Sequence, residues 1–129
     1  ARRAGMPALR IVASAAVAGD PAVPGATAGP AAREALRRAG IGAGAVGAVE
    51  VTEAFAAVAL AFADDLGINE WTLCTEGGAI ALGHPWGASG AVLLVRLTAR
   101  MVQPDGPEFG LAACAIGGGQ GIAMVVQRT

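Results

Sequence analysis

The chain has 129 residues, which is enough for one domain with a hydrophobic core. Its formal net charge of −1 gives no electrostatic reason to expect nucleic acid or an anionic membrane as a partner. Hydrophobic residues make up 54% of the chain and aromatic residues 4%, so the core has to be built from small aliphatic side chains and glycine. All nine basic residues are arginine, which excludes a Schiff-base lysine or a P-loop lysine.

Two cysteines, Cys74 and Cys114, stand far apart in the sequence. Together with a single histidine they cannot form a usual zinc site, so no metal is expected. A disulfide between them is disfavoured in a chain without secretory features. No apolar run reaches the length of a membrane span. The start Ala1-Arg2-Arg3, without methionine or an apolar signal region, indicates a cytoplasmic fragment or one part of a larger assembly.

The first half of the chain alternates strand-like and helix-like segments. Residues 9–17 are β-branched and small, which predicts a buried strand, and residues 19–30 form a loop rich in proline and glycine. A helix is expected from Pro30 to Arg38 with Gly40 as its C-cap, and a short strand at residues 48–51 follows. The next helix is expected over residues 54–66 with Thr52 as its N-cap. Because this helix is apolar nearly all round, we expect it to be buried between layers.

The second half continues this alternation. Residues 71–74 have the composition of a short strand, and a helix is expected from about Ser89 to Met101. A turn at residues 104–107 precedes two strand-like runs, residues 109–116 and 122–127, which a loop of glycines and one glutamine joins. The resulting order β-α-β-α-α-β-β predicts an α/β fold with a sheet covered by helices.

The segment around the only histidine has features of a catalytic loop. Pro85 favours extended backbone at His84, and glycines on both sides permit tight turns. His84 therefore lies just before a helix N-terminus, where unpaired N–H groups carry partial positive charge. That field disfavours imidazolium and favours the neutral ring, which can accept a proton. The alternative is an incidental histidine in a glycine-rich loop.

The loop at residues 117–121 (GGGQG) is a poor match to a phosphate-binding motif, because it joins two strands and no helix follows. It offers a row of backbone N–H groups that no side chain obstructs. Such donors suit an oxyanion hole, where negative charge develops on a carbonyl oxygen. The alternative is a permissive hairpin turn without a ligand.

Three segments together carry a resemblance to a known family: residues 49–56 (VEVTEAFA), 77–90 (GGAIALGHPWGASG) and 109–124 (FGLAACAIGGGQGIAM). In this order they resemble the thiolase family, specifically the C-terminal half of a thiolase. The resemblance runs through residues 1–129, which are therefore expected to form one thiolase-like C-terminal domain. It implies an α/β half, one αβα unit of the five-layer αβαβα fold, with a mixed sheet covered by helices.

The resemblance also implies an activity. Thiolases are acyltransferases that condense two acyl-CoA units or cleave a 3-ketoacyl-CoA, with coenzyme A thioesters as substrates and no bound cofactor. Their nucleophilic cysteine belongs to the N-terminal half, which is expected either on a missing part of the same chain or on a separate subunit. A homo- or hetero-oligomer in the cytoplasm is expected.

Site residues follow from the family motifs. His84, in GHP, would activate the nucleophilic cysteine by taking its proton. Thr52 stands where the NEAF motif has an asparagine that holds a water at one oxyanion hole, and Gly117 would donate its N–H to the other. Phe55 and Gly118 are expected to contact the substrate.

The chain also departs from the family pattern. The family's second cysteine, the acid/base at the substrate's α-carbon, corresponds to Ala115 here, and Cys114 is one residue early. Adjacent strand residues point to opposite faces, so Cys114 should face away from the site unless a bulge turns it. Cys114 then either reaches the substrate or is a buried structural thiol. Glu76 replaces an asparagine and could orient His84, act as an acid/base, or face solvent.

These departures leave two alternatives beside a thiolase. One is a catalytically degenerate subunit with a scaffolding or substrate-binding role. The other is a specialised condensing enzyme, for example a decarboxylative one, which needs no second cysteine for α-proton removal. In each case the apolar residues 54–63 are expected to face a partner or to lie between layers.

Overall fold

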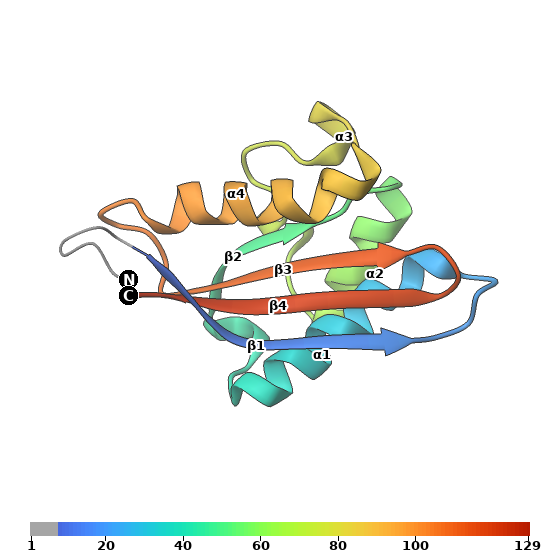
Figure 1. Ribbon diagram of the computed structural model, residues 1–129, viewed down its shortest axis with the longest axis horizontal. Helices are drawn as coiled ribbons and strands as arrows, with labels where there is room; N and C mark the ends of the chain where they lie inside the picture. Colours follow the sequence, from blue (N-terminus) through green and yellow to red (C-terminus); the bar gives the residue numbers. More distant parts are fainter. Residues whose placement is uncertain (1–7) are drawn as a thin grey trace.

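A four-stranded mixed sheet forms the centre of the molecule in the computed structural model, which describes residues 8–129 (Figure 1). Its strands are β1 (Leu9–Ala18), β2 (Val46–Val51), β3 (Phe109–Ile116) and β4 (Gln120–Arg128), in the order β1-β4-β3-β2. β2 and β3 run parallel, whereas β4 pairs antiparallel with both β1 and β3. The α/β architecture with a mixed sheet and helices on both faces confirms the predicted fold class.

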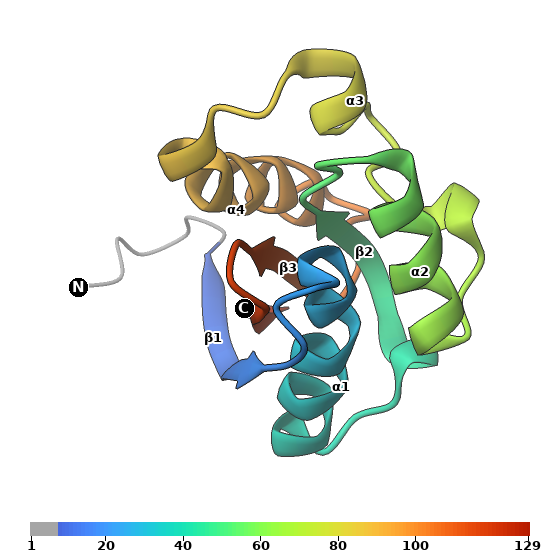
Figure 2. The same ribbon diagram turned by 90° about the vertical axis from the view of Figure 1, so that its right-hand side faces the viewer.

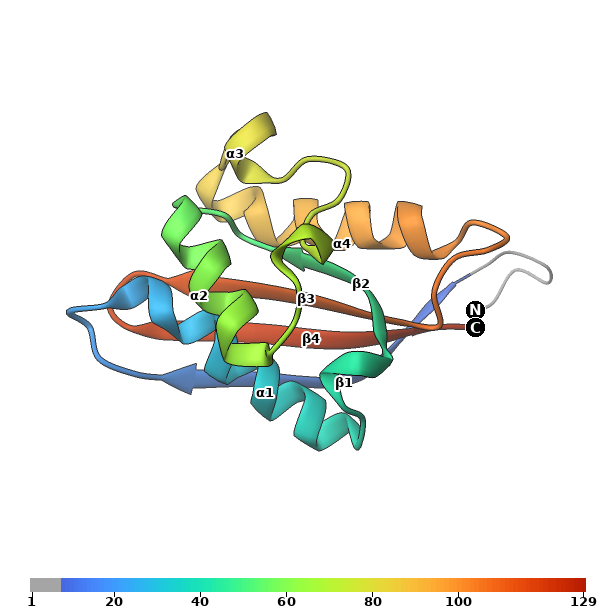
Figure 3. The same ribbon diagram turned by 180° about the vertical axis from the view of Figure 1, so that it is seen from behind.

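The helices cover the two faces of the sheet unequally (Figures 2 and 3). α1 (Ala28–Ala39) and α2 (Ala56–Leu66) lie on one face, and α4 (Ser89–Met101) lies on the other. α4 packs on β2 and β3. Within residues 8–129, the β1–β4 half of that face therefore has no comparable helix cover, and Ile11 on β1 keeps 63% of its surface exposed.

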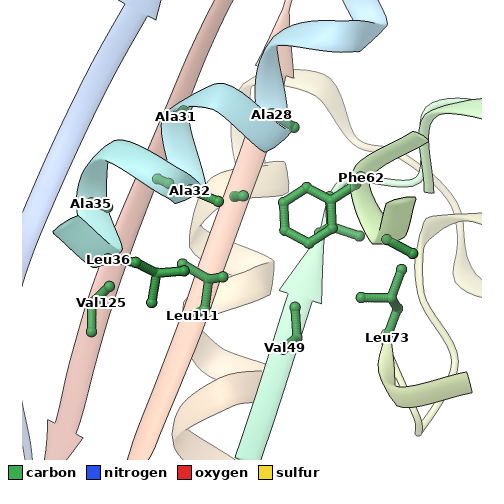
Figure 4. Close-up of a cluster of buried hydrophobic side chains, with 14 of the residues drawn as sticks. Ala28, Ala31, Ala32, Ala35, Leu36, Val49, Phe62, Leu73, Leu111 and Val125 are labelled. Carbon is green, nitrogen blue, oxygen red and sulfur yellow. The ribbon is translucent and has the colours of Figure 1, made fainter. Parts of the chain in front are cut away.

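The larger core lies between the sheet and α1, and it is built largely from alanine (Figure 4). Ala31, Ala32 and Ala35 are fully buried against the sheet, next to Leu111 and Val125. Because these side chains are so short, the helix axis can approach the strands closely. The composition of the chain, rich in alanine and poor in aromatic residues, is accounted for by this close approach.

A second, smaller core lies under α4. Leu93, Leu97 and Met101 pack on Ala112 and Val126 from the neighbouring strands. Strand residues alternate between the two cores, since Leu111 and Ala113 belong to the first and Ala112 to the second. The β2–β3 half of the sheet is thus buried from both sides, as expected for a layered α/β domain.

Several predicted boundaries are confirmed and others are wrong. β1 and α4 begin where expected, and Gly40 caps α1 with a left-handed φ of 71°. α1 itself starts at Ala28, two residues before Pro30, because a 3-10 turn at Pro24–Thr27 leads into it. Proline lies in the first turn in either case, where its missing N–H costs nothing.

α2 differs from its prediction in both its start and its burial. The helix begins at Ala56, with Phe55 in extended geometry at the N-cap position, so Thr52 is not the cap. Val58 and Phe62 are buried, whereas Phe55 and Leu60 are exposed. Within the described chain the helix is therefore covered on one side only, and the predicted burial between two layers is wrong for this chain taken alone.

Residues 70–82 also fold differently from the prediction. Instead of a strand at residues 71–74, a 3-10 turn covers Glu70–Thr72 and one parallel bridge joins Leu73 to Val49. A short helix that was not predicted, α3 (Ala79–Leu82), follows. No helix of the described residues is long and apolar enough to span a bilayer.

Candidate active site

The three motif segments meet at one edge of the sheet. β2 and β3 are parallel, so the residues that follow them, Thr52 and Gly117, lie at the same end. The loop before α4 brings His84 to this edge. A cavity of about 370 Å³ is lined by all three residues together with Ser89 and Cys114. The structure thus brings together residues that are up to sixty-five positions apart, from Thr52 to Gly117.

His84 lies on the loop between α3 and α4, after Gly83, whose φ of 102° few other residues can adopt. Its Nδ1 is 2.6 Å from the Oγ of Ser89, the first residue of α4. If Nδ1 carries the proton and donates it to Ser89, the lone pair of Nε2 is left to accept a proton. This is the tautomer that a general base requires.

Ser89 is a site residue that the sequence analysis missed. It is buried and lines the cavity beside His84. Serine is common at helix starts for purely local reasons, so its position at the beginning of α4 gave no signal of a second role. Only the turn of the loop, which brings residues five positions apart into contact, reveals that Ser89 orients the imidazole.

Trp86 forms an exposed wall beside the histidine. Its ring stacks on the His84 ring with centroids 6.4 Å apart and an interplanar angle of 26°. The residue has a φ of 47°, which is uncommon for a bulky side chain, and 86% of its surface is exposed. Strained, exposed aromatic residues of this kind concentrate at binding and catalytic loops.

Thr52 forms the opposite wall. Its hydroxyl oxygen is 2.9 Å from the Sγ of Cys114, and either atom can donate the hydrogen. Its backbone N–H donates to the carbonyl of Ala113 at 3.0 Å, which holds the residue against β3. Burial raises the pKa of the Cys114 thiol, while the hydrogen bond to Thr52 acts in the opposite direction. Cys114 is therefore a neutral thiol near pH 7.

Cys114 and Ala115 point to opposite faces, as the sequence predicted, because β3 pairs with β4 without a register shift. Cys114 belongs with the core under α4, and Ala115 packs against the core under α1. Both nevertheless line the cavity that contains His84. The Cys114 thiol therefore lines the His84 cavity from the α4 side, where it contacts the hydroxyl of Thr52.

A second cavity, of about 520 Å³, opens on the α2 side of the same edge. Phe55, which is 74% exposed, and Val58 line it together with His84, Trp86 and Ala115. Of the described residues in its lining, His84 alone has a titratable side chain. An apolar cavity with one polar group suits the acyl part of a ligand.

The two glycines predicted to contact a ligand differ in their placement. Gly117 lines both cavities. Gly118 lines neither of them and forms the tight turn between β3 and β4, with a φ of 82°. The turn covers residues 117–119, and β4 begins at Gln120, which is earlier than predicted.

Glu76 faces solvent, which is one of the three roles considered for it. It is exposed and lines a separate depression with Arg100 and Asp105, away from both His84 cavities. Cys74 and Cys114 are both free thiols, so the disulfide is absent, and burial raises the pKa of Cys74 to about 12. In residues 8–129 no three His, Cys, Asp or Glu side chains gather where they could hold a metal ion.

A buried ion pair connects the two elements, α4 and β2, that carry Ser89 and precede Thr52. Arg96 of α4 donates from Nε to the Glu50 carboxylate of β2 at 2.9 Å, and this hydrogen bond raises the pKa of Arg96. The Glu50 side chain is 3% exposed and the Arg96 side chain 16%. The pair links the helix that begins at Ser89 to the strand that ends just before Thr52.

Comparison with known proteins agrees with this geometry. The family model described as thiolase, C-terminal domain, matches residues 6–128, and the chain belongs to the thiolase family. The cytosolic acetyl-CoA acetyltransferase of Mus musculus is 45% identical over 127 residues, which is 98% of this chain and 32% of that protein. The acetyl-CoA acetyltransferase of Shinella zoogloeoides is 48% identical over 126 residues, 98% of this chain and 32% of the relative.

A third relative, the acetyl-CoA acetyltransferase of Rhizobium meliloti (strain 1021), is 46% identical over 128 residues, or 99% of this chain. The chain spans about a third of the length of these curated relatives.

Proposed function

We propose that this chain is the part of a thiolase-type acyltransferase that supplies the catalytic histidine and one oxyanion-hole donor. The observation that carries the proposal is the placement of His84, held by Ser89, in a cavity that it shares with the backbone of Gly117. The relatives are named acetyl-CoA acetyltransferases, which supports coenzyme A thioesters as substrates.

In the proposed reaction His84 accepts the proton of a cysteine thiol that residues 1–129 do not supply. The thiolate then attacks the 3-keto carbonyl of the substrate, and the S–C bond forms as the carbonyl oxygen becomes an oxyanion. The N–H of Gly117 donates to an oxyanion of the reaction. When the tetrahedral intermediate collapses, the C2–C3 bond breaks, the acyl group stays on the cysteine as a thioester, and the departing acetyl-CoA carbanion takes up a proton. The thiol of a second coenzyme A then attacks this thioester, which releases acyl-CoA and restores the cysteine.

The nucleophile belongs, in this proposal, to an N-terminal half on the same chain or on a separate subunit. The face of the sheet beside α4 is where we place that half. Ile11 and Ile122 are exposed there, and exposed apolar side chains on a sheet face are unfavourable in water. A second α/β half on this face would lie next to the N-terminal end of α4 and so next to His84.

A partner contact of residues 54–63 is a separate part of the proposal: Phe55 and Leu60 are exposed there, and Phe55 lines a cavity together with His84. We further propose an oligomer, homomeric or heteromeric, in the cytosol. The cytosolic designation of the Mus musculus relative and the two free thiols of this chain support that location.

Thiolysis of acetoacetyl-CoA by the protein that contains both halves tests the proposal. His84→Ala should lower kcat by a factor of about 10² to 10⁴, the usual contribution of a general base. Trp71→Ala is a matched control, because Trp71 is exposed and lines neither cavity. Equal rates in the wild type and in His84→Ala would refute the role of His84.

A decarboxylative condensing enzyme is a second candidate, favoured by Ala115. Thiolysis needs a group at the α-carbon to give or take a proton, and Ala115 cannot do so, while Cys114 lies on the other face of β3. Loss of CO₂ from a malonyl thioester leaves the electron pair on the α-carbon directly. That carbanion attacks the acyl group on the nucleophilic cysteine, and no proton has to be removed from carbon.

Ala115→Cys distinguishes the two candidates. If the protein is a thiolase that lacks an efficient acid/base, the new thiol should raise the rate of acetoacetyl-CoA thiolysis. If it is decarboxylative, the wild type should release CO₂ from malonyl-CoA, and Ala115→Cys should not be needed for turnover. A wild type that is inactive in both assays would support the degenerate subunit with a binding role.

A further inference from the structure

The segment that carries His84 has few attachments to the rest of the described chain. Residues 81–88 are all exposed, and α3 stands away from the body of the domain (Figures 1 and 2). A histidine on such a segment can serve as a base only if something fixes its position, because a displacement of about 1 Å can cost a factor of about 10² in rate.

One side-chain hydrogen bond, called the tie below, holds this segment to the residues that directly follow β2. The backbone N–H of Ile80, in the first turn of α3, donates to Oε2 of Glu53 at 3.1 Å. Ile80 is one of the residues whose N–H has no partner within its own helix, and the Glu53 carboxylate supplies the acceptor that this N–H lacks. Glu53 directly follows Thr52, so the tie runs from one wall of the cavity to the loop that forms the other.

Gly78 makes room for this contact. A Cβ added at Gly78 would lie 2.1 Å from the carboxylate oxygen of Glu53 and 2.5 Å from its Cδ. The Glu53 carboxyl group therefore lies directly against the backbone of residue 78. Since Gly78 has a φ of −100°, alanine could adopt its backbone geometry, and the requirement for glycine here is one of space.

We propose that Glu53 is a positioning residue for His84, and that its carboxylate fixes the upstream end of the histidine loop while Ser89 fixes the ring at the downstream end. Glu53 lines neither of the two cavities that contain His84, so it acts through the loop and does not touch the substrate. This inference rests on the proposed function, because positioning matters only if His84 is the base.

The experiment compares Glu53→Ala and Glu53→Gln in the protein that contains both halves. Loss of the tie in Glu53→Ala should lower kcat for acetoacetyl-CoA thiolysis about ten- to a hundredfold, with KM changed less than about threefold. Glu53→Gln keeps an acceptor oxygen and should recover most of the activity. Glu76→Ala, which removes an exposed carboxylate outside the site, is the matched control and should leave kcat unchanged.

Gly78→Ala provides an independent route to the same defect, because the new methyl group displaces the Glu53 carboxylate. It should reproduce the loss seen in Glu53→Ala. Gly44→Ala is its control, since a Cβ at residue 44 meets no atom within 4 Å. Circular dichroism melts establish that each variant is folded before its kinetics are compared.

Amide hydrogen exchange of the peptide over residues 79–84 tests the tie without any activity. Exchange should be faster in Glu53→Ala and Gly78→Ala than in the wild type, and close to wild type in Glu53→Gln. Unchanged exchange in Glu53→Ala would overturn the proposal. It would also be overturned if Glu53→Gln were as inactive as Glu53→Ala with normal exchange, because Glu53 would then act as an acid/base. A wild type without acyltransferase activity, combined with the expected exchange, would refute the proposed function and leave the tie itself supported.

Discussion

Replacing Arg96 should lower the free energy of unfolding far more than replacing an exposed arginine on a helix would. Arg96 reaches from α4 to Glu50 on β2, where the carboxylate is 3% exposed and has Arg96 as its ion-pair partner. In Arg96→Met the apolar part of the side chain is largely retained, but Glu50 is left as an uncompensated buried charge. The ion pair lies between α4 and β2, and the Glu50 carboxylate has little access to water.

The size of the effect follows from the burial of the two partners. Breaking a buried ion pair by removing one partner costs about 3–5 kcal/mol, whereas an exposed pair contributes about 1 kcal/mol or less. Because the Arg96 side chain is 16% exposed, we expect a value at the lower end of the buried range, about 3 kcal/mol. A loss of that size is a large part of the total stability of a domain, about 5–15 kcal/mol.

Urea unfolding at pH 7, followed by far-UV circular dichroism, measures this loss as a lower midpoint at a constant m-value. The double variant Glu50→Leu/Arg96→Met replaces both charges by apolar groups and should recover to within about 1 kcal/mol of the wild type or exceed it. A loss below about 1 kcal/mol in Arg96→Met would refute the assignment of Glu50–Arg96 as a buried pair. A double variant as unstable as Arg96→Met would show that packing, and not charge, decides the effect.

Three further predictions concern thiols, packing and acid stability. Iodoacetamide should label Cys114 before Cys74 in the folded protein, because Cys74 is buried and its pKa is raised to about 12. Mass spectrometry measures the order of labelling, and labelling of Cys74 first would contradict this. Since that pKa is raised on folding, the associated stability is present below the unfolded thiol pKa, 9.0, and is lost as the pH rises toward 12. Gly110→Ala should cost about 1–3 kcal/mol in urea unfolding, because its Cβ would lie 2.4 Å from a methionine sulfur under α4, whereas Gly44→Ala should cost little. Hydrogen bonds from two arginines of α1 lower the pKa of Glu34 from 4.5 to about 2. The contribution of this carboxylate to the free energy of unfolding is therefore present above pH 4.5 and is lost as the pH falls toward 2. In Glu34→Gln, the free energy of unfolding measured against pH should fall less steeply on the acid side.

The sequence alone determined most of the secondary structure and the identity of the family. Runs of β-branched and small residues located β1 and β3 within a residue or two, and the helical spacing of apolar residues located α4, which buries one continuous stripe of Leu93, Leu97 and Met101. Gly40 was predictable as a helix cap, since only the left-handed conformation ends the helix there. The side-chain alternation along β3, and with it the opposite orientation of Cys114 and Ala115, also followed from local geometry alone.

The predictions from local sequence were wrong where a residue contacts a part of the chain that is distant in sequence. Thr52 has the composition of a helix cap, yet its hydroxyl contacts Cys114 across the sheet edge, and the helix begins four residues later. Residues 71–74 look like a strand, but only Leu73 pairs with β2, because the chain turns away toward the His84 loop. The short helix α3 was not predicted, since four residues carry too little periodicity to be recognised.

The tertiary structure alone decided how His84 is held. The sequence placed this histidine before a helix and marked it as a candidate base, but it contained no sign that Ser89 would orient the ring or that Glu53 would tie the loop to β2. Those contacts depend on the path of the backbone through residues 77–88, where several glycines would permit many different backbone conformations. Contacts with the neighbouring strand end and helix then fix that path, and such contacts cannot be inferred from local propensities.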